Sequence, residues 1–153
     1  MMNTAVDGSE HLQSSALDGA LADLLNLALL ANHARWNIIG PRFLTMRRVL
    51  EEVADFARSS ADSVAERAIM LGHAPDGRAP SIAQRSSLPI IEPGGLRDVV
   101  AIAAFDAILD AVVDRVHAAM EAFETDLVTL HLFTCILGMI ERYAWMLRAQ
   151  SNA

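Results

Sequence analysis

Hydrophobic positions repeat at helical spacing in four long segments, at about residues 17–39, 43–71, 96–123 and 126–149. In the second segment the apolar residues fall on one side of a helix, and the opposite side is highly charged. The first and fourth segments are apolar on most sides, which indicates helices that pack against more than one neighbour. In the third segment, aspartates at helical intervals predict a solvent-facing stripe: Asp98, Asp106, Asp110 and Asp114. The pattern therefore predicts four long helices.

Proline and glycine divide these segments unevenly. Short turns join the first two predicted helices and the last two, so each pair should be antiparallel, and Asp126 is expected to cap the fourth helix. Residues 72–95 are too many for a simple loop and are long enough to run the length of a bundle. The predicted fold is all-α, a ferritin-like four-helix bundle with one long crossover, in which the PSIAQ sequence forms a short helix. We expect the bundle to span residues 17–150 and residues 1–16 to form a flexible N-terminal tail.

The chain is unusually apolar, with 53% hydrophobic residues. Either a membrane or other subunits must cover the excess. The longest uncharged run, Leu127 to Ile140, is shorter than the roughly 18 residues that a membrane span needs. We therefore expect a soluble protein that forms oligomers, with no membrane partner. The first residues do not resemble a secretory signal, and the single cysteine, Cys135, suits a reducing cytoplasm.

The charge balance argues against nucleic acid as a partner. The net charge is −7, the chain has twelve arginines and no lysine, and residues 1–34 contain neither. Non-specific affinity for DNA comes mainly from neutralising phosphates, and the acidic N-terminal segment would repel them. DNA binding is therefore not expected.

A charged stripe follows one side of the second predicted helix. Arg47, Glu51, Arg58, Asp62 and Glu66 all fall within about a quarter-turn at 100° per residue. One interpretation is a solvated face with ion pairs four residues apart, Arg47 with Glu51 and Arg58 with Asp62. The other is that Asp62 and Glu66, one turn apart, belong to a metal site, because hard divalent cations prefer carboxylate oxygens. The spacing alone leaves both open.

Several motifs together resemble the Dps family, the mini-ferritins named for DNA protection during starvation. They are RWNIIGPRF, then DSVAERAIMLG, then DG after a short gap, and ERYAWMLRA near the C-terminus. Their order and spacing agree with the family over about residues 17–149. The resemblance implies four-helix subunits that assemble into hollow shells of twelve, oxidise Fe(II) and store the product; many members also bind DNA. Iron is then the expected metal and a homo-oligomer, a dodecamer, the expected assembly.

The resemblance implies that the family's iron-oxidising site lies between two subunits. One subunit supplies an Asp and a Glu, which correspond to Asp62 and Glu66. The other supplies two histidines, whose positions are occupied here by Arg35 and Arg47. A guanidinium has no lone pair to offer and is not a metal ligand. Our hypothesis is that these arginines form ion pairs with the carboxylates across the subunit interface and replace the metal site, so no residue is assigned as catalytic.

Two further groups are interpreted through the same resemblance. Trp36 and Glu51 are adjacent to this site, and Trp36 is interpreted as a structural anchor at a helix end rather than a redox relay. Glu121, Glu124 and Asp126 cluster near the last turn, where the family has acidic pores that admit cations. A solvated acidic turn explains the three acids equally well.

The remaining histidines are weaker candidates. Asp114 and His117 are interpreted as ordinary surface residues, because the D-x-x-H pair has no second motif to complete a site. His131 and Cys135 lie one helical turn apart and could bind a soft metal, but a packed histidine and a buried thiol are favoured. His33 should lie on another face of its helix from Arg35 and does not simply replace a lost ligand.

The resemblance thus implies an iron-sequestering shell protein that protects against oxidative stress, with its ferroxidase site impaired or lost. One alternative is an active Fe(II)-oxidising mini-ferritin that uses Asp62 and Glu66 with an unforeseen ligand. The other is a non-enzymatic structural or interaction shell protein with no metal role.

Overall fold

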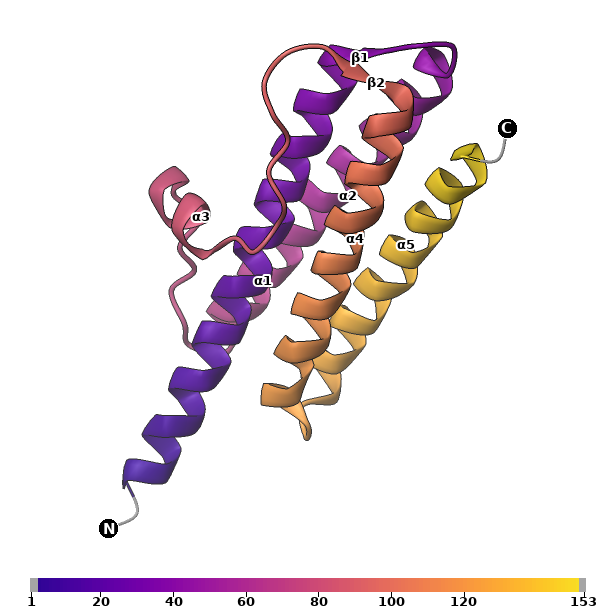
Figure 1. Cartoon of the computed structure of the whole chain (residues 1–153). Helices are drawn as coiled ribbons and strands as arrows, with labels where there is room; N and C mark the ends of the chain where they lie inside the picture. Colours follow the sequence, from indigo (N-terminus) through magenta and orange to yellow (C-terminus); the bar gives the residue numbers. More distant parts are fainter. Residues whose placement is uncertain (1–2, 152–153) are drawn as a thin grey trace.

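The structure is a computed structural model that describes residues 3–151, and four long helices form its bundle (Figure 1). A short helix, α3, lies outside the bundle, and one turn of 3-10 helix follows α4. The elements in chain order are α1 (Asn3–Asn37), β1 (Ile38–Ile39), α2 (Phe43–Met70), α3 (Ala79–Arg85), β2 (Leu96–Arg97), α4 (Asp98–Met120), the 3-10 helix η1 (Glu121–Phe123) and α5 (Leu127–Ser151). The predicted all-α class is confirmed.

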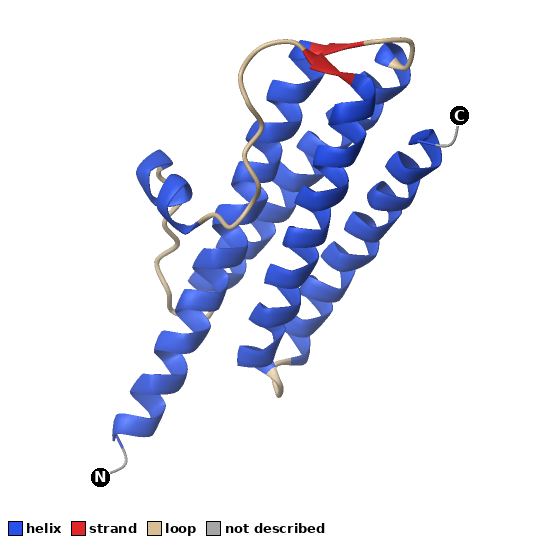
Figure 2. Cartoon of the chain, viewed as in Figure 1, coloured by secondary structure: helices blue, strands red, loops and turns tan. Residues whose placement is uncertain are grey.

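The long crossover also follows the prediction. The chain leaves α2 at one end of the bundle, passes through α3 and returns along α1 to the other end, where α4 begins (Figure 1). The predicted short helix is confirmed as α3. At the top of the view the two-residue strands pair in parallel, with Ile38 opposite Leu96 and Ile39 opposite Arg97 (Figure 2). The sequence did not predict this pair, because two residues are too few to show a period.

Helix α1 is longer than the sequence analysis expected. It begins at Asn3, so residues 3–16 of the predicted tail are helical, and residues 1–2 lie outside the described residues. The helical residues 3–16 project beyond the ends of α4 and α5 (Figure 1). No proline interrupts the segment, and the one interior glycine there, Gly8, costs only about 1 kcal/mol relative to alanine. The side chain of Gln13 donates a hydrogen bond to the carbonyl of Ala122 at 3.2 Å, which ties the extension to the end of the bundle.

The core lies between the four long helices and is lined by aliphatic side chains and three fully buried phenylalanines, Phe105, Phe123 and Phe133. Most of the stripe predicted on α2 is buried as expected: Leu50, Val53, Ala57, Ala61, Val64 and Ala68. Leu71, its last member, is only partly buried and lies just beyond the end of the helix. Burying a large apolar side chain stabilises the fold by about 1.5–3 kcal/mol, so this core is the main source of stability. Two helical stretches, Gly8–Asn37 and Leu127–Ser151, are long and apolar enough to cross a membrane, a test that core helices of soluble proteins also pass.

A buried carboxylate fastens the crossover to the bundle. Asp23 on α1 is fully buried and accepts hydrogen bonds from Ser86 Oγ at 2.9 Å and from the backbone N–H and Oγ of Ser87 at 2.7 Å each. Arg115 on α4 completes the set with an ion pair at 3.0 Å. Gly19 makes room for this arginine, because a Cβ there would lie 2.6 Å from Arg115 Nη1. One charge therefore joins α1, the crossover and α4.

A second buried carboxylate, Asp98, holds the α1–α2 turn against the start of α4. It accepts hydrogen bonds from the backbone N–H groups of Arg42 at 3.0 Å and Val99 at 2.8 Å. The bond from Arg42 is the main cause that lowers the pKa of Asp98. Gly40 has a φ of +132°, and a Cβ there would meet the Asp98 carboxylate at 2.6 Å, so this turn requires glycine.

The prediction that the aspartates of α4 form a solvent-facing stripe is therefore wrong for its first member, Asp98. Asp98 is only 3% exposed because it lies in the first turn of the helix, where it accepts backbone N–H groups. Asp110 and Asp114 are exposed as predicted. Asp106 is partly buried, and together with Asp110 it binds Arg148 of α5.

Replacing Asp23 with Asn should lower the free energy of unfolding by roughly 3 kcal/mol, because it leaves Arg115 without its counter-charge. Urea unfolding followed by circular dichroism measures this at a fixed protein concentration. The matched control is Asp114→Asn, an exposed aspartate on α4, which should change stability by less than about 0.5 kcal/mol. Equal stability of the two variants would contradict the role given to Asp23.

Candidate functional site

The end of α1 and the start of α2 bring Arg35, Arg47 and Glu51 together as one arginine cluster. Arg35 Nη1 lies 2.8 Å from Glu51 Oε1, and its Nε donates to Asn32 Oδ1 at 2.9 Å. Arg47 Nη1 donates to the backbone carbonyl of Arg35 at 3.4 Å. The two arginines are thus neighbours, and Glu51 neutralises one of them within the same chain.

Trp36 lies beside this cluster but does not anchor the core of its own chain. Its side chain is 66% exposed, and the guanidinium carbon of Arg35 lies 6.0 Å from its ring centroid, within cation–π range. Phe43 and Leu44 are also exposed nearby in sequence. The helix turn therefore presents apolar surface next to the arginine cluster.

Asp62 and Glu66, hereafter the carboxylate pair, lie farther along the exposed face of α2. Asp62 is eleven residues beyond Glu51, which is about 16 Å along the helix axis. Within residues 3–151 neither carboxylate has a hydrogen bond or an ion pair. One chain therefore does not join the carboxylate pair to the arginine cluster, and any contact between them needs a second chain.

The ion pairs on α2 differ from those that the spacing predicted. Glu51 pairs with Arg35 of the neighbouring helix instead of Arg47, and Arg58 pairs with Asp55 at 3.2 Å instead of Asp62. Arg35 is only 21% exposed and also bonds to Asn32, which holds its guanidinium beside Glu51. Arg47 is exposed and bonds instead to the backbone carbonyl of Arg35. Spacing within one helix does not reveal a partner from another.

The described part of the chain contains no cluster of three or more His, Cys, Asp or Glu side chains that could hold a metal ion. The carboxylate pair could offer two oxygen ligands to a hard cation such as Fe(II). The arginine cluster could offer only the carboxylate of Glu51, which already binds Arg35. On the residues of one chain, the ligand set is incomplete.

Of the three acids expected near a pore, Asp126 is committed to a structural role. Its Oδ1 accepts from the backbone N–H groups of Val128 and Thr129 at 3.1 Å each, which confirms the predicted cap of α5. Arg67 of α2 binds both carboxylate oxygens, at 3.0 and 2.8 Å. Glu121 and Glu124 are exposed.

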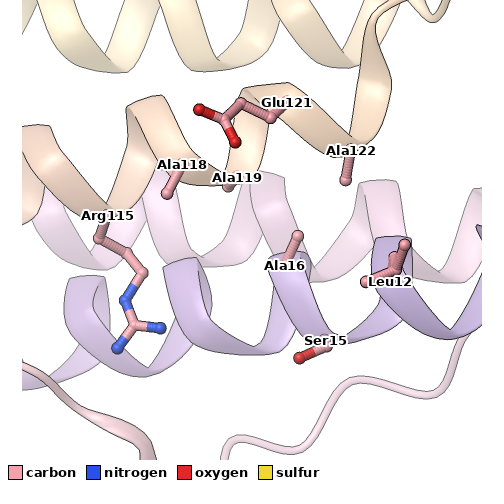
Figure 3. A pocket seen from close by; sticks show the side chains of 8 residues that line it. All are labelled: Leu12, Ser15, Ala16, Arg115, Ala118, Ala119, Glu121 and Ala122. Atoms are coloured by element: carbon pink, nitrogen blue, oxygen red, sulfur yellow. The ribbon is translucent and has the colours of Figure 1, made fainter.

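A groove of about 420 Å³ lies between the first part of α1 and the end of α4 (Figure 3). Alanines form much of its wall, Arg115 points toward α1, and Glu121 points away from it. The arginine is already bound to Asp23 and to the carbonyl of Arg85, so the groove offers little specific chemistry.

The remaining candidates also differ from expectation. Cys135 is exposed, so the predicted buried thiol is wrong, and its Sγ lies 3.6 Å from Nε2 of His131. His117 is exposed, as predicted. His33 has a buried Nε2 without a hydrogen-bond partner, a feature of its tertiary surroundings that no sequence signal indicated.

Comparisons with known proteins agree on one family. Residues 14–153 match the ferritin-like domain. The chain is 34% identical over 145 residues to DNA protection during starvation protein 2 of Deinococcus radiodurans, covering 93% of this chain but only 60% of that relative. It is 29% identical to the DNA protection during starvation protein of Mycolicibacterium smegmatis, over 87% of this chain and 73% of that one. The crystal structure of Dps92 from Deinococcus radiodurans superposes with a TM-score of 0.88 at 31% identity, covering 93% and 87% of the two chains, which confirms the predicted ferritin-like topology.

Asp126→Asn should reduce stability by about 1–2 kcal/mol at pH 7, with a loss that depends on pH. Burial raises the pKa of Asp126, but the hydrogen bonds from Thr129 and Arg67 outweigh it and lower the pKa from 3.8 to about 2. The ionised group therefore stabilises the fold above pH 3.8, and this contribution is lost as the pH falls through about 2. Urea unfolding at several pH values should show the two proteins converging in acid. Glu124→Gln, an exposed neighbour, should match the wild type throughout.

Proposed function

Because this chain belongs to the Dps family of ferritin-like proteins, we propose that it forms an iron-sequestering shell that protects against oxidative stress, with its inter-subunit ferroxidase site impaired or lost. The observation that carries the second part is the pair of arginines, Arg35 and Arg47, at both positions where the family has histidine ligands. A guanidinium stays protonated at any accessible pH and has no lone pair to give to iron. Iron here is substrate and cargo.

The contacts of Arg35 support the loss of the site. Its guanidinium is bound by Glu51 at 2.8 Å and by Asn32 at 2.9 Å, and these contacts place its positive charge beside α2. Arg47 adds a second cation within hydrogen-bond distance of the Arg35 backbone. With one carboxylate against two guanidiniums, the arginine cluster is net positive and would repel Fe(II).

The carboxylate pair has the opposite charge and no partner within the described chain. We place it against the arginine cluster of a neighbouring subunit, where fork-like hydrogen bonds between guanidinium and carboxylate would replace metal coordination. Arg35 is already engaged with Glu51, so Arg47, the exposed arginine, is the one that reaches the neighbour. The joined site would then hold two guanidiniums and three carboxylates, a net charge of −1 instead of the −2 of the carboxylate pair alone.

The proposed assembly is a homo-oligomer, a dodecamer of about 200 kDa from 16.6 kDa chains, located in the cytoplasm. Its support in this chain is the exposed apolar surface. Large hydrophobic side chains that are more than half exposed include Trp36, Leu44, Met70, Leu127 and Trp145. An apolar surface of this extent favours burial against other subunits.

An anaerobically purified shell, mixed with Fe(II) in air, should show no fast oxidation that depends on the site. Its initial rate, followed by the absorbance of Fe(III), should equal that of Asp62→Ala within about twofold. The double variant Arg35→His with Arg47→His should oxidise Fe(II) on the order of tenfold faster or more, because it restores two nitrogen ligands.

Size-exclusion chromatography must show the same oligomer for every variant, so that a rate change is not a change in assembly. Adding Asp62→Ala to the double-histidine variant should abolish the gained rate. Rapid oxidation by the wild type that is lost in Asp62→Ala would refute the proposal and favour the active-ferroxidase alternative. Shells that take up no iron under any condition would instead favour the non-enzymatic alternative.

We also propose that this shell does not bind DNA, although its relatives are named for DNA protection. Residues 1–34 carry no Lys or Arg, and the chain is net negative by seven charges. The intact oligomer should leave the mobility of linear duplex DNA unchanged at low salt and neutral pH. A variant with several lysines added at its N-terminus is the positive control and should retard DNA. Salt-sensitive retardation by the wild type would contradict this proposal.

A further inference from the structure

His131 and Cys135 form an exposed pair of soft donors on α5. They lie one helical turn apart on the same face, with Cys135 Sγ 3.6 Å from His131 Nε2. Both side chains are exposed, although the apolar surroundings in sequence predicted that they would be packed. The two donors are four residues apart on one helix. The two histidines of the H-E-x-x-H motif have the same spacing and bind zinc. The pair is therefore spaced so that one ion can contact both donors.

The pair borders a groove of about 290 Å³ between α2 and α5. Met70, Val128 and Leu132 supply apolar and thioether surface to this groove. Glu66 of the carboxylate pair lines it as well. The one positive side chain in the lining, Arg67, is engaged with Asp126 and Thr129 and does not compete for the donors.

We propose that His131 and Cys135 bind a soft monovalent cation, Cu(I), at the edge of this groove. Thiolate and thioether donors select Cu(I), whereas hard cations prefer oxygen ligands. Structural zinc sites need four protein ligands, and the described residues hold no larger cluster here. Cu(I), in contrast, accepts a pair of donors. On binding, the Cys135 thiol loses its proton to solvent, sulfur bonds to copper, and the neutral imidazole gives the lone pair of Nε2.

The donors of this site are separate from the residues of the ferroxidase proposal, although Glu66 of the carboxylate pair lines the same groove. The site uses α5 residues that have no part in the arginine cluster, and the test below contains no iron. Because the two assays use different metals and different variants, a failure of one proposal is distinguishable from a failure of the other.

The test is an anaerobic competition for Cu(I) between the intact oligomer and the coloured chelator bicinchoninate. The wild type should withdraw one Cu(I) per chain from the chelator and show a sulfur-to-copper absorption band in the ultraviolet. Cys135→Ser should lose the band, and Cys135→Ser and His131→Ala should each weaken binding on the order of tenfold or more. His117→Ala removes an equally exposed histidine from α4 and should leave binding unchanged.

Circular dichroism and sizing should confirm that each variant keeps its fold and assembly. Equal competition by the wild type and Cys135→Ser would overturn the proposal, as would a loss of binding in His117→Ala. Stoichiometric, Cys135-dependent binding of Zn(II) with no competition for Cu(I) would also overturn it.

Discussion

The fold depends on how two buried carboxylates are neutralised. Taking an ionised aspartate out of water is very costly unless hydrogen bonds and a counter-charge replace the water. Asp23 meets this condition only when the two serines of the crossover and Arg115 of α4 surround it. Asp98 meets it only when the α1–α2 turn lies against the start of α4. These two charges therefore select one path for the crossover among those that the apolar faces alone would allow.

Opposite charges lie at separate points along α2. The arginine cluster lies at the α1–α2 turn, and the carboxylate pair lies about three turns farther along the helix. In one chain they are too far apart to neutralise each other, so each presents unbalanced charge at the surface. Repeated in a symmetric assembly, such a chain is complementary to its own copy. In the proposed assembly, the geometry that the family resemblance assigns to metal ligands would serve ion pairs, because Arg35 and Arg47 occupy the two histidine positions.

The proposed loss of iron chemistry at the ferroxidase positions does not exclude another metal chemistry elsewhere in the chain. The donors at the arginine cluster are hard or absent, whereas those on α5 are soft. Ligand type, more than position in a shared fold, decides which cation is bound. A shell with ion pairs at its ferroxidase positions and a thiol–imidazole pair beside the groove would have exchanged one metal preference for another.

Periodicity and breakers in the sequence were sufficient for the four long helices, the crossover, the short helix α3 and the capping role of Asp126. These features are local, since apolar spacing, proline and a carboxylate before a helix act within a few residues. Four features did not follow from the pattern: the exposure of Cys135, the burial of Asp98, the pairing of Glu51 with Arg35, and the start of α1 at Asn3. Each depends on which element lies alongside: Arg35 reaches Glu51 from another helix, and Gln13 finds a carbonyl more than a hundred residues away. The sequence by itself determined the elements and the types of ligand available, whereas only the tertiary structure decided which charges meet, because desolvation and distance are set by packing.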